Sequence, residues 1–309
     1  MNLLSAELRK VEPTLFLYGE GWTAGASPLP DNQRALKANA AALRHIAVFS
    51  DDLRDGLKGS VFEDTGKGFV NGAGGAEESV KFGIVAATPH PQVDYAKVNY
   101  SKAPWAAEPD QCINYVSCHD NQTLYDKLVL TCGGTHSAAE IEQMDKMANA
   151  IVLTSQGVPF LHAGEEMLRT KHGEHNSFNQ PDAVNQIDWD GKRQHAGVFK
   201  YYQGLIALRK AHPAFRMTTT AAIQQNLKFL AAVPSHVIAY TLDGRAAGDS
   251  WDEIFVVFNA NRVAATVALP PGRWRVVVTG TEVDLAAQKT VEGGDLAVPA
   301  LSSWILHRE

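Results

Sequence analysis

The 309-residue sequence has no apolar run long enough to cross a bilayer, only three cysteines and no cluster of basic residues. A membrane-spanning helix needs about 20 consecutive apolar residues, whereas the longest apolar stretches here have the length of a strand. The formal net charge is −6, so the chain offers little attraction to nucleic acid or to an anionic membrane. We therefore expect a soluble protein that binds neither of these partners.

The cysteines, Cys112, Cys118 and Cys132, are odd in number and show no metal-ligand spacing. This favours buried free thiols over a disulfide framework. The first residues, MNLLSAELRKVEP, lack the charged segment and apolar segment of a signal peptide.

Two kinds of periodicity divide the chain. With 45% hydrophobic residues in 309, the sequence can bury one large core and a smaller one, which predicts two domains. Apolar residues at helical spacing predict helices, and short continuous apolar runs predict buried strands. The predicted helices cover residues 4–11, 36–47, 141–151 and 198–208, and the predicted strands cover 15–18, 56–62, 112–118 and 158–164.

From about residue 220 the pattern contains strands only: VIAYTL, EIFVVFNA, AATVAL, RWRVVVTG and SSWILH. We expect an α/β domain over residues 1–219 and a small all-β sandwich over 220–309. Because strands that are buried on both faces alternate with helices in the first part, its sheet should be parallel.

Polar residues stand where two of the predicted strands end. Glu20 lies between two glycines in LFLYGEGW, directly before Trp22, and His119 and Asp120 follow CINYVSC. In (β/α)-barrel enzymes the chemistry is found at the carboxyl ends of the strands. These residues are therefore the first candidates for an active site.

Four ordered segments make the pattern more specific: YGEGW, YVSCHDNQTLYDKL, GVPFLHAGEEMLRTK and HNSFNQPDAVNQIDW, followed by the β domain. Together they resemble the C-terminal half of a type I pullulanase in the α-amylase (GH13) superfamily. The resemblance implies strands five to eight of a (β/α)8 barrel followed by a β-sandwich. It implies a retaining glycoside hydrolase that debranches starch at α-1,6-glucosidic bonds.

The resemblance also implies a role for several residues. Glu20 matches the general acid/base, Asp120 the acid that stabilises the transition state through sugar hydroxyls, and His119 a residue that binds the same sugar. The nucleophilic aspartate of the family belongs to the fourth barrel strand, and no matching motif occurs here. We therefore expect this chain to be inactive alone. Further substrate contacts are expected from Trp22, Asn121, Asn176, Ser177, Phe178, Asn179 and Asp182.

Other interpretations of these segments remain open. We expect Glu20 to be buried beside Trp22, although a glutamate after a strand is more often a solvated loop residue. His119 and Asp120 could instead cap a helix beginning in NQTL. Residues 162–175 are rich in His and Glu but have no HExxH spacing, so we predict neither a metal site nor a required cofactor, and nothing indicates structural calcium. Residues 71–78, NGAGGAEE, are predicted to form a flexible loop.

Trp251, Trp274 and Trp304 could form a starch-binding platform, but core positions are the more common place for tryptophan. The expected partner is an α-glucan or oligosaccharide, and two open barrel edges would favour a homo-oligomer. The alternatives to a debranching hydrolase are a non-catalytic carbohydrate-binding remnant and another α-glucan enzyme such as an isoamylase or a branching enzyme. Localisation stays undecided, because a signal sequence of a longer protein would precede Met1.

Overall fold

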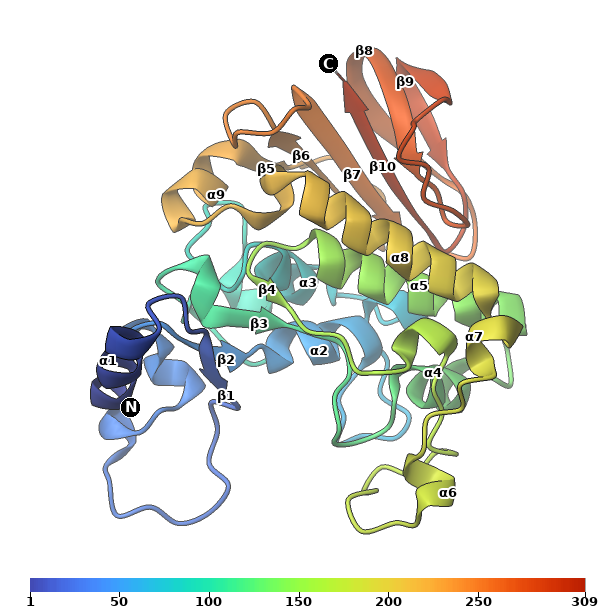
Figure 1. The fold of residues 1–309 in the computed structure, drawn as a ribbon. Coiled ribbons are helices and arrows are strands. Elements are labelled where there is room, and N and C mark those ends of the chain that lie inside the picture. The colour runs from blue at the N-terminus through green and yellow to red at the C-terminus, as the bar shows by residue number, and fades with distance from the viewer. Residues whose placement is uncertain (309) are drawn as a thin grey trace.

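The computed structural model describes residues 1–308, which form a parallel sheet, an antiparallel sheet and a layer of helices between them (Figure 1). The helices are α1 Asn2–Val11, α2 Asp51–Lys58, α3 Glu77–Ile84, α4 Leu124–Cys132, α5 Ala138–Thr154, α6 Asp182–Asn185, α7 Gly191–Gln194, α8 Ala196–Ala211 and α9 Thr220–Asn226. No helix within residues 1–308 is both long and apolar enough to cross a bilayer.

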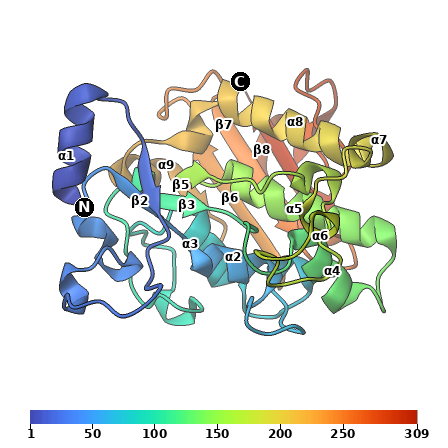
Figure 2. The same ribbon diagram turned by 60° about the horizontal axis from the view of Figure 1, so that its bottom comes forward.

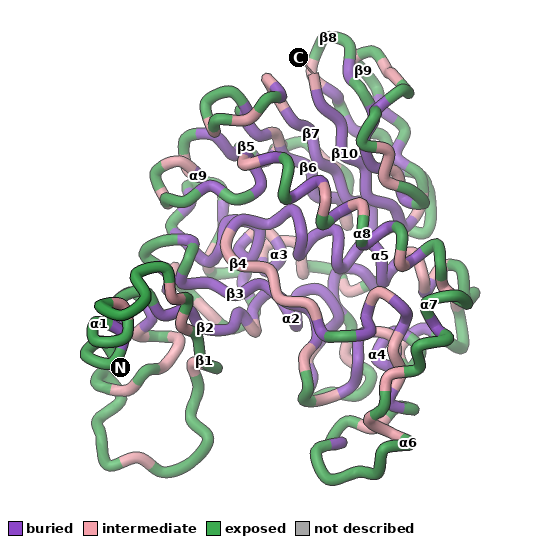
Figure 3. The backbone as a smooth tube through the Cα atoms, viewed as in Figure 1, coloured by how far each residue is buried: buried purple, intermediate pink, exposed green. Residues whose placement is uncertain are grey.

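The parallel sheet has the strand order β1-β2-β3-β4. Its strands are β1 Leu17–Gly19, β2 Ile46–Phe49, β3 Cys112–Asn114 and β4 Val158–Pro159. The two central strands are buried along their whole length, whereas β1 is exposed over its last two residues. This is the parallel sheet with intervening helices that the sequence predicts, with β1 and β4 at its edges. Figure 3 shows the contrast between the buried centre and the exposed first strand.

Two predicted elements in this part are wrong. Residues 36–47, predicted as one helix, form a 3-10 helix over Lys37–Ala42 and then strand β2. Residues 56–62, predicted as a strand, are the end of helix α2 and a turn. The signal that was missed is Ser50, whose hydroxyl accepts a hydrogen bond from Leu53 N, followed by two aspartates in the first turn. Serine is a favoured N-cap residue, and acidic side chains stabilise the amino end of a helix.

The stretch between β2 and β3 is more ordered than its composition indicates. Residues 71–78, predicted as a flexible loop, form turns that lead into α3 at Glu77. α3 packs against α2, where Gly83 lies so close to Leu53 that an added Cβ would be 2.5 Å from Leu53 Cδ1. The close approach of these two helices therefore requires glycine at this position.

The antiparallel sheet has the strand order β5-β6-β7-β10-β8-β9. Its strands are β5 Leu227–Phe229, β6 Val237–Asp243, β7 Glu253–Asn259, β8 Ala265–Val278, β9 Thr290–Val298 and β10 Ser302–Arg308. AATVAL and RWRVVVTG, predicted as two strands, both belong to β8, whose pairing with β9 is interrupted between Leu269 and Arg273. The prediction omitted α9, β5 and β9.

Each face of the antiparallel sheet has its own core. One face, which includes Tyr240, Val256 and Ile305, joins the core of the helical layer, and Figures 1 and 2 show α5 and α8 between the two sheets. The other face packs against the β8–β9 hairpin, which folds over it. This arrangement agrees with the predicted β-sandwich. Trp251, Trp274 and Trp304 are all buried, so they are core residues and not an exposed platform.

Candidate active site

The ends of strands β1 and β3 bring three predicted residues together. His119 Nε2 lies 3.9 Å from Glu20 Oε1 and 3.6 Å from Asp120 Oδ2. One side-chain atom from each of the three residues lies within 4.8 Å of the others. Glu20 and His119, about 100 positions apart in the sequence, thus meet because parallel strands end at the same edge of a sheet.

The second glycine of YGEGW fixes the turn after Glu20. Gly21 has φ +81°, and a Cβ at this position would lie 2.7 Å from Val48 Cβ on the neighbouring strand. A side chain would therefore be strained by its backbone conformation and would also overlap β2. This close contact with β2 holds the chain as it leaves β1 and so fixes where Glu20 projects.

Glu20, His119 and Asp120 line a cavity of about 660 Å³. Its walls also include Asn121 and the aromatic residues Tyr18, Trp22, Phe49, Phe62, Tyr115 and Phe160. Phe49 is the centre of the aromatic wall, with its ring 4.9 Å from Tyr115, 5.1 Å from Phe160 and 6.4 Å from Trp22. Cavities of this size that combine aromatic walls with a few polar groups are typical of small-ligand sites.

The expected burial of Glu20 is wrong. Its side chain is 49% exposed and Trp22 is 40% exposed. The cause is the position of β1, whose other edge has no pairing strand among residues 1–308. The cavity is therefore open on that side, and water reaches the carboxylate.

The capping alternative for His119 and Asp120 fails on geometry. Helix α4 begins at Leu124, and its cap is Thr123, whose hydroxyl accepts a hydrogen bond from Asp126 N at 3.1 Å. Asn121 has a left-handed backbone with φ +63°. The carboxylate of Asp120 therefore stays outside the helix and faces the cavity.

The substrate contacts predicted within residues 176–182 do not line this cavity. Asn176, Asn179 and Asp182 are exposed on the segment around α6, and Phe178 is 80% exposed. Ser177 is buried, and its hydroxyl accepts a hydrogen bond from Lys171 Nζ at 2.7 Å. Lys171 Nζ also donates to the carbonyl oxygen of His119 at 2.6 Å. The segment is thus connected to the cavity by Lys171, a residue that sequence reasoning missed.

Sequence reasoning also missed Asp51 and Arg54, two residues of α2 that line the cavity. Arg54 donates to both carboxylate oxygens of Asp55, at 2.5 and 3.0 Å, and to Tyr115 OH at 3.0 Å. Burial would lower the pKa of Arg54, but the hydrogen bond to Asp55 and nearby negative charge raise it. Burial raises the pKa of Asp51 despite its ion pair with Lys37. The sequence signal for these two residues was the segment SDDLRD, in which an N-cap serine and charged side chains follow the apolar run of β2.

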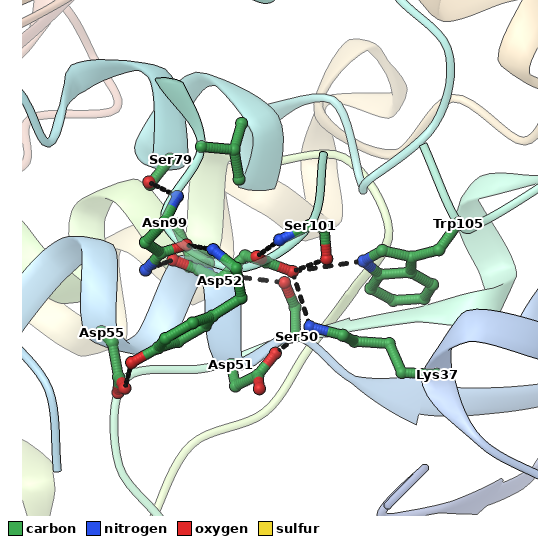
Figure 4. A network of polar contacts seen from close by, with 12 residues as sticks. Lys37, Ser50, Asp51, Asp52, Asp55, Ser79, Asn99, Ser101 and Trp105 are labelled. Carbon is green, nitrogen blue, oxygen red and sulfur yellow. Dashed lines mark hydrogen bonds and ion pairs between the residues drawn. The ribbon is translucent and has the colours of Figure 1, made fainter. Parts of the chain in front are cut away.

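Asp52, the next residue of α2 after Asp51, is the centre of a network of polar contacts (Figure 4). Its fully buried carboxylate accepts hydrogen bonds from Ser101 N at 2.8 Å, Ser101 Oγ at 2.7 Å and Trp105 Nε1 at 3.3 Å. Lys37 Nζ pairs with the same carboxylate at 2.9 Å. The segment that contains Ser101 and Trp105 is therefore tied to the first turn of α2.

Among residues 1–308 the one cluster of side chains with metal-ligand spacing is Glu20, His119 and Asp120, and it contains no residue of the His- and Glu-rich segment 162–175. His162 accepts a hydrogen bond from Arg169 Nη1 at 3.2 Å. Burial and the positive charge of Arg169 lower the pKa of His162 to about 3. His162 is therefore neutral and serves as a structural acceptor. Exposed acidic clusters are common without an ion, so we assign no cation to the other three residues.

Comparisons with known proteins agree with this architecture. The family model "Pullulanase, all-beta domain" matches residues 223–282. A pullulanase of Bacillus subtilis is 38% identical over 84% of this chain and 35% of its own length. The structure of a pullulanase from Bacillus acidopullulyticus superposes with a TM-score of 0.91 and 40% identity, over 99% of this chain and 36% of that one. The structure of a pullulanase from Paenibacillus barengoltzii, in complex with maltohexaose and α-cyclodextrin, superposes with a TM-score of 0.86 and 39% identity. The match covers 99% of this chain and 45% of that one.

The parallel sheet, the following β domain and these matches show that the chain is homologous to proteins of the α-amylase superfamily. Within that superfamily it is a homologue of the type I pullulanases. The chain spans about a third of the length of the curated relative from Bacillus subtilis.

Proposed function

We propose that this chain supplies the acid/base part of the active site of a starch-debranching glycoside hydrolase, which cleaves α-1,6-glucosidic bonds with retention. The observation that carries the proposal is the convergence of Glu20, His119 and Asp120 within 4.8 Å in an aromatic-walled cavity. Oligosaccharide binding by the Paenibacillus relative supports an α-glucan as the substrate class.

Glu20 is the general acid in this proposal. It protonates the oxygen of the leaving sugar, and in the second half of the reaction the same carboxylate takes a proton from the attacking water. Asp120 accepts hydrogen bonds from sugar hydroxyls and stabilises the positive charge that develops on the ring. His119 lies between the two carboxylates and donates to the same sugar. Trp22 and Phe49 offer apolar faces for the sugar rings.

The nucleophile is proposed to come from further polypeptide that completes the barrel. The relatives are about three times as long as the matched region, and the outer edge of β1 is unpaired within residues 1–308. Helix α1 beside it exposes Leu3, Leu4, Leu8 and Val11. An unpaired strand edge beside an exposed apolar helix is a suitable surface for another β-α unit. Self-association of two chains through this surface is the alternative.

A non-catalytic role in carbohydrate binding is favoured by one observation. Glu20, His119 and Asp120 are all exposed, so the low-dielectric surroundings that strengthen catalytic electrostatics are absent from the described residues. In this alternative the cavity binds glucan without turnover, and additional barrel strands do not change this result.

The decisive experiment measures reducing-sugar release from pullulan by the 309-residue chain, alone and after co-expression with the first half of a type I pullulanase barrel. We expect no release by the chain alone and clear release by the complemented chain. Glu20→Gln should then reduce the rate by about 10²- to 10⁴-fold, the usual contribution of general acid catalysis. Glu282→Gln, an exposed change in the β domain, is the matched control and should leave the rate unchanged.

Glucan binding without turnover in the complemented chain would favour the non-catalytic alternative. Substantial release by the unsupplemented chain that Glu20→Gln abolishes would show that the nucleophile lies within these 309 residues, and the proposed division of the site would then be wrong.

A further inference from the structure

A second cavity, of about 670 Å³, lies on the other side of Lys171 from the candidate active site. The flanking residues Thr170 and His172 line the second cavity, whereas Lys171 itself reaches back to the carbonyl oxygen of His119. The second cavity is formed by the segment after β4 and by the segment that includes α6 and α7, in the lower right part of Figure 1. The two cavities share no lining residue.

Trp189 is the most unusual residue of this second cavity. It stands between α6 and α7 and is 70% exposed. Among residues 1–308 its indole has no hydrogen bond, stacked ring or cation contact. Trp22 is 40% exposed, and the remaining four tryptophans, Trp105, Trp251, Trp274 and Trp304, are buried. An exposed indole without a partner in its own chain is an apolar face available to a ligand.

Polar side chains around Trp189 are equally free. Gln186, Gln194 and His195 line the cavity, and their side chains make no hydrogen bond within residues 1–308. Asp188 adds a carboxylate to the same wall. Amide, imidazole and carboxylate groups can donate to or accept from a series of hydroxyl groups. The wall therefore suits a neutral ligand with many hydroxyls.

Arg169, another residue of the cavity lining, ties the segment after β4 to α6. Its guanidinium donates to Ala163 O at 3.0 Å and to Asn185 O at 2.5 Å, in addition to His162. Asn185 in turn donates to Ser177 O at 2.7 Å. The cavity is consequently held between two tied segments before any ligand binds, which reduces the entropy cost of binding.

We propose that this second cavity binds a glucosyl or maltosyl unit of an α-glucan, with the sugar face on Trp189 and its hydroxyls on Gln186, Gln194 and Asp188. A cavity of this volume falls within the usual range for small ligands. The ligand class rests on the proposed function, since the substrate of that function is an α-glucan. The site gives the chain a second contact with the same polymer, on the far side of Lys171.

The test uses the 309-residue chain labelled with 5-fluorotryptophan and titrated with maltotriose, followed by ¹⁹F NMR. The sequence has six tryptophans, and single Trp→Phe variants assign their signals. We expect the Trp189 signal to shift in a saturable manner while the signal of buried Trp304 stays fixed. Gln194→Ala should weaken the apparent affinity at Trp189 by about three- to tenfold, the loss of one hydrogen bond. Gln288→Ala, an equally exposed change without a side-chain hydrogen bond, should not alter it.

An unshifted Trp189 signal at maltotriose concentrations up to the solubility limit would overturn the proposal. So would a shift that Gln194→Ala leaves unchanged, because the sugar would then bind elsewhere. The Trp22 signal reports the candidate active site independently. A shift of Trp189 without one of Trp22 would support the second site and count against the proposed function.

Discussion

Replacing Asp52 by asparagine should loosen one wall of the candidate active site without adding or removing a heavy atom. Asp52 accepts hydrogen bonds from Ser101 N, Ser101 Oγ and Trp105 Nε1 and pairs with Lys37. Asparagine keeps one acceptor oxygen but turns the other position into an NH₂ donor that faces these donors.

The magnitude follows from the contacts that are lost. A hydrogen bond to a charged group contributes about 1.5–3 kcal/mol, and the substitution weakens at least two of them. Lys37 retains its ion pair with Asp51, which limits the loss. We therefore expect about 3 kcal/mol of local stability to be lost, equivalent to roughly a 100-fold change in an opening equilibrium.

Native-state hydrogen exchange measures this effect directly. The amide of Ser101, which donates to Asp52 Oδ1, should exchange about 100-fold faster in Asp52→Asn. Glu7→Gln, which removes an exposed ion pair with Lys10 on α1, should leave that amide unchanged. An unaltered exchange rate at Ser101 in Asp52→Asn would refute the view that this carboxylate holds the segment in place.

Three further predictions concern other parts of the chain. Lys171→Met should free the 170–177 segment from His119, and the amide exchange of both segments should increase; exchange equal to that of the unmodified chain would exclude this connection. Burial raises the pKa of Asp145 to about 7, although a hydrogen bond from Tyr202 opposes the shift. Protonated Asp145 therefore stabilises the folded state below the unfolded pKa near ~4, and this stabilisation is lost as the pH rises towards 7. Asp145→Asn should remove this dependence of the melting temperature on pH between about pH 4 and pH 7, and an unchanged slope would contradict the assignment. Phe178→Ala should leave maltotriose binding at the Trp22 cavity unchanged, because its side chain is exposed and outside that cavity; a marked loss would bring the 176–182 group back into that site.

The sequence predicted the fold where apolar periodicity was strong. The helices near residues 141–151 and 198–208 are present as α5 and α8, and the five predicted runs of the antiparallel sheet lie in the four strands β6, β7, β8 and β10. The prediction failed at Ser50, where an N-cap outweighed the apolar periodicity. It also failed where apolar residues at helical spacing continued into a strand, since Ala47 lies in β2. The boundary at residue 219 stays a prediction.

The site was predictable only as far as strand ends could be recognised. Glu20, His119 and Asp120 follow two strands and converge. The exposure of Glu20 depends on β1 being an edge strand, and the contacts of Asp51, Arg54 and Lys171 depend on distant segments. Such long-range contacts leave no local pattern in a single sequence.

The role of Glu20 as general acid is the central claim, and one comparison of two substrates tests it directly. An α-maltosyl fluoride carries a leaving group that needs no protonation, whereas pullulan requires it. In the complemented chain, Glu20→Gln should lower pullulan hydrolysis by about 10²- to 10⁴-fold while the initial burst of fluoride release remains close to that of the unmodified protein. An equal loss on both substrates would contradict the claim, because Glu20 would then be needed for a step other than protonation of the leaving group.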